Sequence, residues 1–333
     1  MNISKSLAAT GIIALAGIGA ARAEETTVKF QDYPGTGNTL FRMAAAKGYC
    51  EKHGIKCVFQ TIPAAPLGVQ ALLAGSIDVA YAPPEVVINA SLKGAALKAI
   101  ATGAQDNVIE IVARNGLDIP DGDKDFKGMM AALKGKKIGV PARGSAAELI
   151  FGFIAEKAGE KAGDYTYVAV GGPVTSTGSL KSGQIDASVT YEPSGSICDV
   201  TKECKSLYRA ATAKEPKEIS GTNGAAVVYV VTQAMIDKSP KLIDAIIAAA
   251  KDAEAFAQNP ANFPEALKIT KSYFELKMPH GAEILEYSLK RSILAQRPHI
   301  SLDAMKQIAA NMLATKQIAE PFDTSKIIYD KAP

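Results

Sequence analysis

A nine-residue pattern occurs twice in this sequence, and it constrains the fold more than any other feature. The first copy covers residues 72–80 (LLAGSIDVA) and the second covers residues 180–188 (LKSGQIDAS). Each copy reads as a helix end, a glycine that can take a positive φ as a C-cap, and a buried strand. Pro and Glu follow both copies. We therefore expect two similar lobes, each built around the same strand–helix–strand unit.

Short β-rich runs alternate with amphipathic helical stretches through most of the chain. This alternation is typical of a mostly parallel sheet covered by helices. The predicted fold class is α/β, with two mostly parallel sheets that carry helices on both faces and are hinged by two crossover strands. The runs Val108–Arg114 and Ala225–Val231 are the expected crossovers. Lobe 1 would then comprise residues 24–110 and 226–333, and lobe 2 would comprise residues 111–225.

The same patterns predict several single elements. Residues Thr39–His53 are expected to form one helix, and Ile77–Tyr81 one strand. Beyond Val231 the periodicity is almost entirely helical. We expect this helical tail to pack back on lobe 1.

The first 23 residues have the pattern of a secretory signal peptide. Lys5 supplies a positive charge, residues 7–20 are mostly apolar, and Ala21-Arg22-Ala23 supplies the small residues that a signal peptidase requires. The apolar run is shorter than the roughly 20 residues needed to span a bilayer, which favours cleavage after Ala23 over a membrane anchor. The expected location is the periplasm.

Composition and charge exclude some classes of partner. The 37 Lys and Arg residues face 34 Asp and Glu residues, which leaves a formal charge of +3 on 333 residues. A nucleic-acid-binding protein needs a basic surplus to neutralise phosphates, and this sequence has none. With 47% hydrophobic and 21% charged residues, the composition is that of a soluble globular protein, which we expect to be a monomer.

Four cysteines, Cys50, Cys57, Cys198 and Cys204, allow three disulfide pairings in an exported chain. We expect the two local pairs, Cys50–Cys57 and Cys198–Cys204, because each pair brackets a short helix-to-strand turn. The wide spacings and the three scattered histidines do not fit a zinc site. No metal is predicted.

Ligands of open α/β sheets bind beyond the carboxyl ends of the strands, so these ends indicate the candidate binding residues. The candidates in the first half of the chain are Tyr33, Thr36, Asn38, Pro84 and Glu85. Those in the second half are Arg143, Gly144, Ser145, Tyr191, Glu192 and Asn223. The alternatives are that the tyrosines pack at the rim and that Asn223 forms a turn. For Glu85 and Glu192, the alternative is that each acid stabilises the start of its helix.

The turn Arg143-Gly144-Ser145 is the sharpest of these candidates. Ser145 would begin a helix whose N–H groups and positive dipole end suit an anion, and Arg143 could add a bidentate contact. The alternative is that Ser145 only caps its own helix while Arg143 lies in solvent.

The sequence contains no recognisable catalytic set. It has no G-x-S-x-G motif, no P-loop and no histidine close in sequence to a candidate nucleophile. Gly35 and Gly37 resemble part of a dinucleotide fingerprint, but Leu40 takes the place of its third glycine. We expect a non-enzymatic binding protein that needs no cofactor.

Several segments occur in the order found in one known family. They are Lys47–Ile55, Leu73–Asp78, Leu133–Val140, Gly144-Ser145 and Ile185–Pro193. With the signal peptide, they make the sequence resemble the periplasmic substrate-binding proteins of ABC importers for nitrate, sulfonates, taurine and thiamine-precursor pyrimidines (the NMT1-like family). The resemblance implies a type II periplasmic-binding-protein fold, whose lobes close on a small-molecule ligand and deliver it to a membrane permease.

The resemblance implies two kinds of ligand. Gly144-Ser145 matches the place where sulfonate binders hold their anionic group, which favours a small organic anion such as a sulfonate or an aromatic carboxylate. The family's pyrimidine binders pair an acid near Glu192 with ring nitrogens, so a thiamine-precursor pyrimidine is the alternative. Tyr191 stands where many members have Trp, which this chain lacks. A ligand-sensing subunit of a signalling system, or an enzyme on the same fold, would share this cleft.

Overall fold

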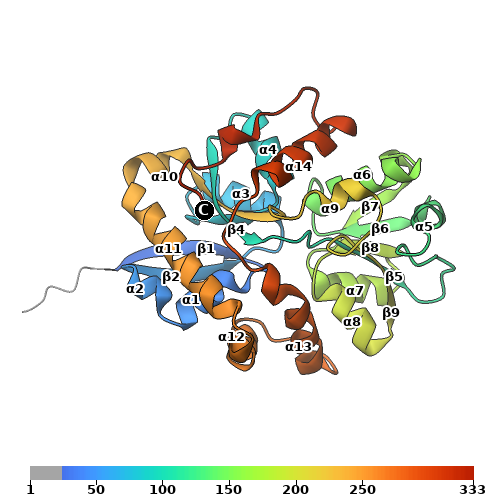
Figure 1. Ribbon diagram of the computed structural model, residues 1–333. Helices are drawn as coiled ribbons and strands as arrows, with labels where there is room; N and C mark the ends of the chain where they lie inside the picture. The colour runs from blue at the N-terminus through green and yellow to red at the C-terminus, as the bar shows by residue number, and fades with distance from the viewer. Residues whose placement is uncertain (1–24) are drawn as a thin grey trace, which may run out of the picture.

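The computed structural model describes residues 25–333, so the cleavage predicted after Ala23 lies outside the described part of the chain. Two sheets, each covered by helices, lie side by side and are joined by connecting segments (Figure 1). The predicted two-lobed α/β class is confirmed. Within residues 25–333, none of the helices has the length and apolar character that a membrane span requires.

The sheet of the first lobe combines early strands with one late strand. β1 and β2 pair in parallel, while β10 lies between β3 and β4 and runs antiparallel to both. A bridge between Phe30 and Val79 connects the two parts, so the strands follow the order β2-β1-β3-β10-β4. The bounds are β1 (Thr26–Asp32), β2 (Ile55–Thr61), β3 (Ala80–Ala82), β4 (Leu97–Ala104) and β10 (Val227–Thr232).

The sheet of the second lobe repeats this arrangement as β7-β6-β8-β5-β9. Here β5 is the inserted antiparallel strand, so β5 and β10 take equivalent places in the two sheets. Both overlap the runs predicted as crossovers, and the residues at which one lobe ends and the other begins stay a prediction. The bounds are β5 (Glu110–Arg114), β6 (Lys137–Val140), β7 (Thr166–Ala169), β8 (Ala187–Thr190) and β9 (Cys204–Arg209).

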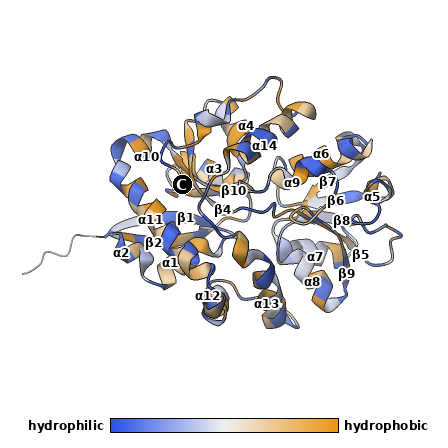
Figure 2. Ribbon diagram, viewed as in Figure 1, coloured by the Kyte–Doolittle hydropathy of each residue, from blue (hydrophilic) through white to orange (hydrophobic). Residues whose placement is uncertain are grey.

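Helices cover both sheets, and hydrophobic and hydrophilic residues alternate around them, as in α11 (Figure 2). The first series is α1 (Thr39–Ala46), α2 (Tyr49–Lys52), α3 (Ala65–Leu73) and α4 (Pro84–Leu92). The second is α5 (Phe126–Leu133), α6 (Ala146–Ala158), α7 (Pro173–Lys181), α8 (Ser194–Thr201) and α9 (Lys217–Ser220). The tail holds α10 (Gln233–Lys238), α11 (Pro240–Ala257), α12 (Phe263–Tyr273), α13 (Gly281–Ser292) and α14 (Leu302–Ala314).

The repeated nine-residue pattern has the same structural role in both lobes. Gly75 and Gly183 lie just beyond the ends of α3 and α7 with φ of 73° and 74°, the left-handed conformation in which glycine is favoured. The aspartate of each copy then accepts a hydrogen bond from a backbone N–H of the neighbouring strand. Asp78 Oδ2 accepts from Lys29 N at 2.8 Å, and Asp186 Oδ2 accepts from Lys137 N at 3.0 Å. The sequence repeat therefore fixes the position of each strand against its neighbour.

Some elements differ from the prediction. The helix expected over Thr39–His53 is divided into α1 and α2 because Gly48 takes a φ of 70°, which interrupts the helical path. The strand expected over Ile77–Tyr81 is shorter and is displaced to Ala80–Ala82 as β3. β9 was not predicted, because Cys204–Arg209 mixes charged and apolar residues without clear alternation.

The two lobes touch along two seams on either side of the space between them. In the first, α4 and α14 of lobe 1 pack against α6 of lobe 2. In the second, α13 packs against α8 of lobe 2, where Ile197 contacts Ile284 and Leu285. α11, α12 and α14 follow the expectation that the tail covers lobe 1, whereas α13 departs from it because its apolar residues are buried against lobe 2.

Both predicted disulfides are present. Cys50 pairs with Cys57 between α2 and β2, and Cys198 pairs with Cys204 between α8 and β9. Each closes a short turn that connects a helix to a strand, and the cysteines of both pairs are buried in hydrophobic clusters.

Replacing Cys198 and Cys204 together with serine is expected to lower the free energy of unfolding by about 2–3 kcal/mol, because a short closed loop restricts the unfolded chain. The corresponding double replacement of Cys50 and Cys57 should give a similar loss, since the closed loops span 6 and 7 residues. Urea denaturation of both variants under non-reducing conditions measures the effect. Unchanged stability in both would contradict the assigned pairing.

Candidate functional site

A cavity of about 370 Å³ lies between the two lobes, where the carboxyl ends of the parallel strands meet. The β1–α1 loop and the residues after β3 form its lobe 1 side. The start of α6 and the residues after β8 form its lobe 2 side, and the segment between β4 and β5 lines it next to the hinge. Its size is suited to a small organic molecule.

The lobe 1 wall is organised by a buried arginine. Arg42 of α1 is fully buried and binds both carboxylate oxygens of Asp32, at 2.9 Å and 2.7 Å. It also donates to the carbonyl oxygens of Gly35 and Tyr33. Asp32 in turn accepts a hydrogen bond from the side-chain N–H of Asn38. The loop that carries Tyr33 and Asn38 into the cavity is therefore held by charge-assisted hydrogen bonds.

The orientation of Asn38 follows from these contacts. Because its Nδ2 donates to Asp32, its Oδ1 is the atom that is left without a partner. The side chain is buried and lines the cavity. The unpartnered oxygen is an acceptor, so it suits a ligand N–H or O–H.

Three tyrosines give the cavity an aromatic wall. The ring of Tyr33 meets Tyr81 and Tyr191 edge to face, with centroid distances of 5.7 Å and 5.6 Å. Tyr191 belongs to lobe 2 and donates a hydrogen bond across the gap to the carbonyl of Pro63 at 3.3 Å. Small apolar residues complete this surface, among them Ala64, Ala146, Val108, Ile109 and Pro83. Such a wall suits a flat or apolar ligand body.

The start of α6 supplies a polar group from lobe 2. Ser145 is the N-cap residue, but its side chain makes no capping hydrogen bond. Its Oγ is buried, has no partner, and belongs to a residue that lines the cavity. Ser145 therefore does not act as a side-chain cap for its own helix, and its hydroxyl is free for a ligand.

One end of the cavity carries a chain of charged side chains. Arg209 binds Glu110 at 3.1 Å and Asp199 at 2.5 Å, and Arg291 lies 3.1 Å from Glu192. Three carboxylates thus face two guanidinium groups, although Asp199 itself does not line the cavity. Burial and then the nearby Glu192 raise the pKa of Glu110, while Arg209 opposes this shift.

Glu192 lines the cavity and has one oxygen without a well-aligned hydrogen bond. Its Oε2 accepts a hydrogen bond from Ser196 Oγ at 2.5 Å. Its Oε1 is buried and accepts no well-aligned hydrogen bond, although Arg291 Nε lies 3.1 Å away as an ion pair. This oxygen can accept a hydrogen bond from a ligand.

Five of the predicted site residues line the cavity: Tyr33, Asn38, Ser145, Tyr191 and Glu192. Thr36, Pro84 and Gly144 do not line it, and neither does Asn223, whose Oδ1 accepts from Asn107 N in the hinge. Thr36 is buried and pairs with Ser288 of α13, and Pro84 lies within the first turn of α4, one residue beyond the lining Pro83.

Arg143 and Glu85 also lie outside the cavity. The Arg143 side chain is 63% exposed and turns to Glu148, which it binds at 2.8 Å. Glu148 accepts from Gly144 N as well, so this acid occupies the positive end of α6 beside Arg143. Of the predicted anion site, Arg143 therefore does not line the cavity, whereas Ser145 does. Glu85 is buried elsewhere, in the seam between α4 and α6.

The sequence prediction missed Glu110, Arg209 and Arg291, which also line the cavity. Arg209 ends β9, so the rule for strand ends would have found it had that strand been predicted. Glu110 begins β5, and the N-terminal end of an antiparallel strand lies at the same sheet edge as the carboxyl ends of its parallel neighbours. Arg291 has no such signal, because only the packing of α13 on α8 brings it to the cavity.

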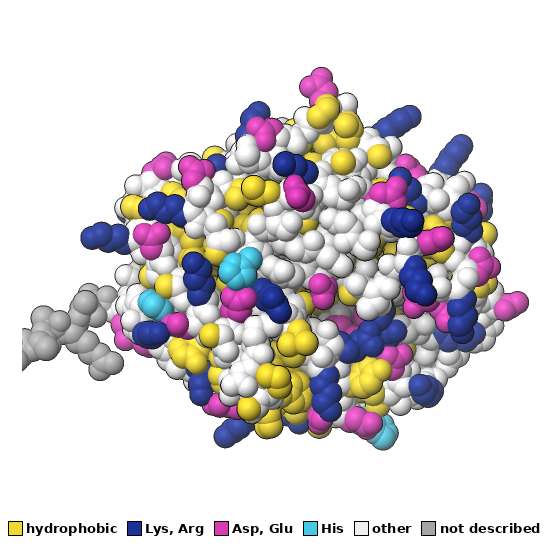
Figure 3. Space-filling view, viewed as in Figure 1, with side chains coloured by type: hydrophobic (Ala, Val, Ile, Leu, Met, Phe, Trp, Pro, Cys, Tyr) yellow, Lys and Arg dark blue, Asp and Glu magenta, His cyan; other side chains and the backbone are white. Residues whose placement is uncertain are grey.

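Among the described residues, no group of three or more His, Cys, Asp or Glu side chains is placed to hold a metal ion. Basic and acidic side chains are intermingled on the face of the molecule in Figure 3. This surface distribution agrees with the nearly balanced charge of the sequence.

Residues 36–262 match the model of the family described as NMT1/THI5-like. A protein of Brucella abortus, named as a candidate binding protein, is 29% identical over 265 residues, which are 78% of this chain and 76% of the relative.

Solved structures share the fold over nearly the whole chain. A ligand-binding component of an ABC-type import system from Staphylococcus aureus has a TM-score of 0.73 and 16% identity, covering 92% of this chain and 99% of its own. The alkanesulfonate-binding protein SsuA from Xanthomonas axonopodis pv. citri has a TM-score of 0.72 and 17% identity, covering 93% and 99%. A Candida albicans protein with the generic periplasmic-binding-protein fold has a TM-score of 0.71 and 14% identity, covering 91% and 96%.

Proposed function

The chain belongs to the NMT1/THI5-like family, and from this we propose that it is the periplasmic solute-binding component of an ABC importer. It would hold a small aromatic molecule with N–H donors between two closing lobes and present it to a membrane permease. The periplasmic-binding-protein fold and the cavity between the lobes support this role. The two disulfides support an exported location, because disulfides persist in oxidising compartments.

The observation that carries the choice of ligand is the chemistry of the cavity wall. Asn38 Oδ1 and Glu192 Oε1 are buried acceptors on opposite lobes; neither accepts a well-aligned hydrogen bond, and Glu192 Oε1 is ion-paired with Arg291 at 3.1 Å. Buried acceptors are normally satisfied, so a ligand that supplies two donors would fit between them. The three tyrosines would cover the ring of such a ligand.

The charges of the cavity support the same choice. The two lining arginines are already paired with carboxylates, and three acids face them. Arg143, on which an anion clamp depended, is turned to Glu148. Both arginines of the cavity wall therefore already have carboxylate partners, so neither is left to balance the charge of a sulfonate or an aromatic carboxylate. A pyrimidine with amino substituents, of the thiamine-precursor kind, carries no negative charge that needs such a partner.

Titration calorimetry of residues 24–333 with an aminopyrimidine, ethanesulfonate, benzoate and nitrate tests this proposal. We expect the aminopyrimidine to bind and the three anions to bind weakly or not at all. A ligand at one hundred times its Kd should also raise the free energy of unfolding by about 2.7 kcal/mol. Ethanesulfonate or benzoate binding more tightly than the aminopyrimidine would contradict the proposal and favour an organic anion.

Replacing Glu192 with glutamine is expected to weaken aminopyrimidine binding by about 10- to 100-fold, because a hydrogen bond to a charged group contributes about 1.5–3 kcal/mol. The same calorimetry measures the effect. Glu283→Gln is the matched control, since Glu283 is exposed on α13, where its carboxylate pairs with His280. Equal affinity of the Glu192→Gln variant and the unaltered protein would contradict a ligand contact at this carboxylate.

A further inference from the structure

A carboxylate is buried between the lobes at a distance from the ligand cavity. Glu85 lies in the first turn of α4 and is 6% exposed. It lines a second cavity of only about 10 Å³, enough for at most a single water molecule. Pro83, which precedes α4, lines the larger cavity, but neither Glu85 nor any other residue of α4 does. The ligand site therefore gives no reason for an acid at this position.

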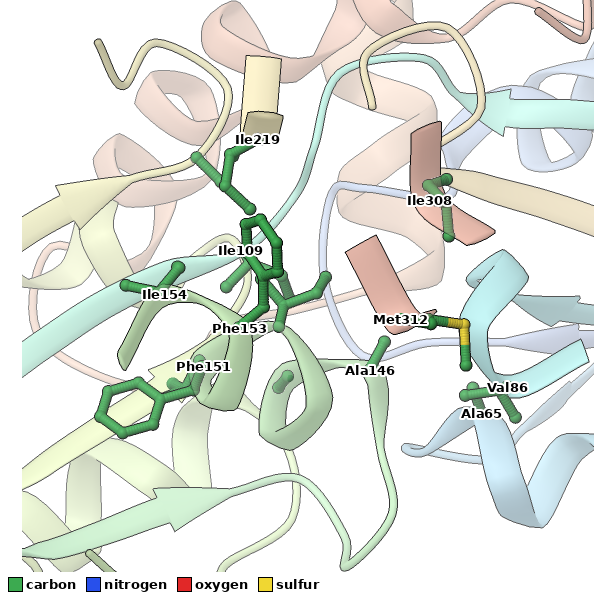
Figure 4. Close-up of a cluster of buried hydrophobic side chains, with 14 of the residues drawn as sticks. Ala65, Val86, Ile109, Ala146, Phe151, Phe153, Ile154, Ile219, Ile308 and Met312 are labelled. Atoms are coloured by element: carbon green, nitrogen blue, oxygen red, sulfur yellow. The ribbon is translucent and has the colours of Figure 1, made fainter. Parts of the chain in front are cut away.

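Both lobes contribute to the surroundings of Glu85. Leu149, Ile150 and Phe153 come from α6 of lobe 2, and Ile219 and Thr222 come from the segment that returns from lobe 2. Asn107 of the hinge and four tail residues complete the lining: Ile308, Asn311, Met312 and Gln317. Figure 4 shows Phe153 and Ile219 on one side of this hydrophobic cluster, and Ile308, Met312 and Val86 on the other. Separation of the lobes would remove the α6 side chains and expose Glu85 to water.

None of the residues that line this small cavity with Glu85 is titratable, and its Oε2 has no hydrogen-bond partner. The charged side chains of the packed elements are exposed or ion-paired, with Glu148 bound to Arg143 and Lys157 bound to Glu218. They are Asp106, Glu148, Glu156, Lys157, Lys217, Glu218, Asp303, Lys306, Lys316, Asp323 and Lys326. No charge from these elements compensates an ionised Glu85, and an uncompensated buried charge is strongly unfavourable.

We propose that Glu85 links closure of the lobes to proton uptake, so that the protein gains one proton at this carboxyl group when it closes and releases it when it opens. The proposal rests on the hinged closure that is part of the proposed function. It does not depend on which ligand is bound, because Glu85 lies outside the ligand cavity.

The direction of the pH effect follows from the burial of Glu85. Burial raises the pKa of Glu85 from its ordinary value of 4.5 to about 7 in the closed form. In an open form the exposed carboxyl group would regain its ordinary pKa. Between these two values, the ratio of closed to open protein falls up to tenfold for each unit by which pH rises, because one more proton is bound in the closed form. Above the upper value the ratio stays constant.

Small-angle X-ray scattering of the ligand-free protein from pH 5 to pH 8 measures this equilibrium. The unaltered protein is expected to expand as pH rises, with its radius of gyration changing mainly below pH 7. Glu85→Gln and Glu85→Leu remove the titrating group, so both should stay compact over the whole range. Glu283→Gln, which alters an exposed acid, should follow the unaltered protein. Circular dichroism confirms that each variant is folded.

The outcomes separate this inference from the proposed function. If the unaltered protein expands as pH rises and the Glu85 variants expand in the same way, the proton link is overturned but the hinged closure is not. A protein that stays compact in every variant, at every pH, would overturn the hinged closure as well. Should one Glu85 variant fail to fold, the other provides the comparison, because glutamine keeps the shape and leucine the apolar fit of the protonated acid.

Discussion

Replacing Gly35 with alanine is expected to weaken ligand binding by about 10- to 100-fold, since overpacking a tight contact costs about 1–3 kcal/mol. A Cβ atom on Gly35 would lie 2.6 Å from the carbonyl oxygen of Glu192 and 3.4 Å from Cδ of Pro193. Gly35 belongs to lobe 1 and these two atoms to lobe 2, so the added methyl group would hold the lobes apart. A backbone oxygen cannot rotate out of the way as a flexible side chain can.

Gly163→Ala is a matched control outside the site, because a Cβ on Gly163 meets nothing within 4 Å. Gly35 lines the cavity and Gly163 does not. Calorimetry with the aminopyrimidine measures affinity, and scattering of the loaded protein reports closure. We expect only the Gly35 variant to lose affinity and to stay expanded, while its unfolding midpoint without ligand changes little. Equal affinity of the two variants would contradict closure around this contact.

Replacing Arg42 with methionine is expected to lower the free energy of unfolding by about 3–5 kcal/mol, because it leaves a buried acid without its partner. Asp32 is 7% exposed at its side chain and takes two hydrogen bonds from Arg42. The loop carbonyls of Tyr33 and Gly35 also lose their donor. Ligand affinity should fall as well, since this loop carries Tyr33 and Asn38.

A second variant distinguishes the ion pair from simple loss of volume. Replacing Asp32 with leucine together with Arg42→Met removes both charges, and such exchanges of a buried pair are often nearly neutral. The double variant should therefore be more stable than Arg42→Met alone, although Asn38 then loses its acceptor. Urea denaturation of the three proteins gives the comparison. If Arg42→Met lowers the free energy of unfolding by less than about 1 kcal/mol, the prediction is contradicted, because surface ion pairs contribute as little.

Much of the fold was predictable because it depends on local patterns. The repeat at residues 72–80 and 180–188 indicated two equivalent lobes, and its glycines and aspartates have the same roles in both. The break at Gly48 was not predictable from helical periodicity, because the apolar spacing continues through it while the backbone does not. The packing of α13 on lobe 2 depends on contacts between distant residues, which periodicity does not report.

The candidate site was predictable only in part. Tyr33, Ser145, Tyr191 and Glu192 follow strands, so the rule for strand ends found them. The same rule selected Arg143 and Glu85, which do not line the cavity: Arg143 pairs with Glu148, and Glu85 lies in the seam. The rule locates a backbone position at the sheet edge, but neighbouring groups such as Glu148 decide where a long side chain points.

The sequence alone indicated that this protein has two similar α/β lobes, two local disulfides and a cleft at the strand ends. These properties follow from short-range features: period, turn glycines and the spacing of cysteines. Only the tertiary structure decided that Arg209 and Arg291 join Glu110 and Glu192 at the cavity, and that Glu85 is buried in the seam. The reason is physical, because the position of one rigid lobe against the other depends on the sum of many weak contacts between residues far apart in the chain.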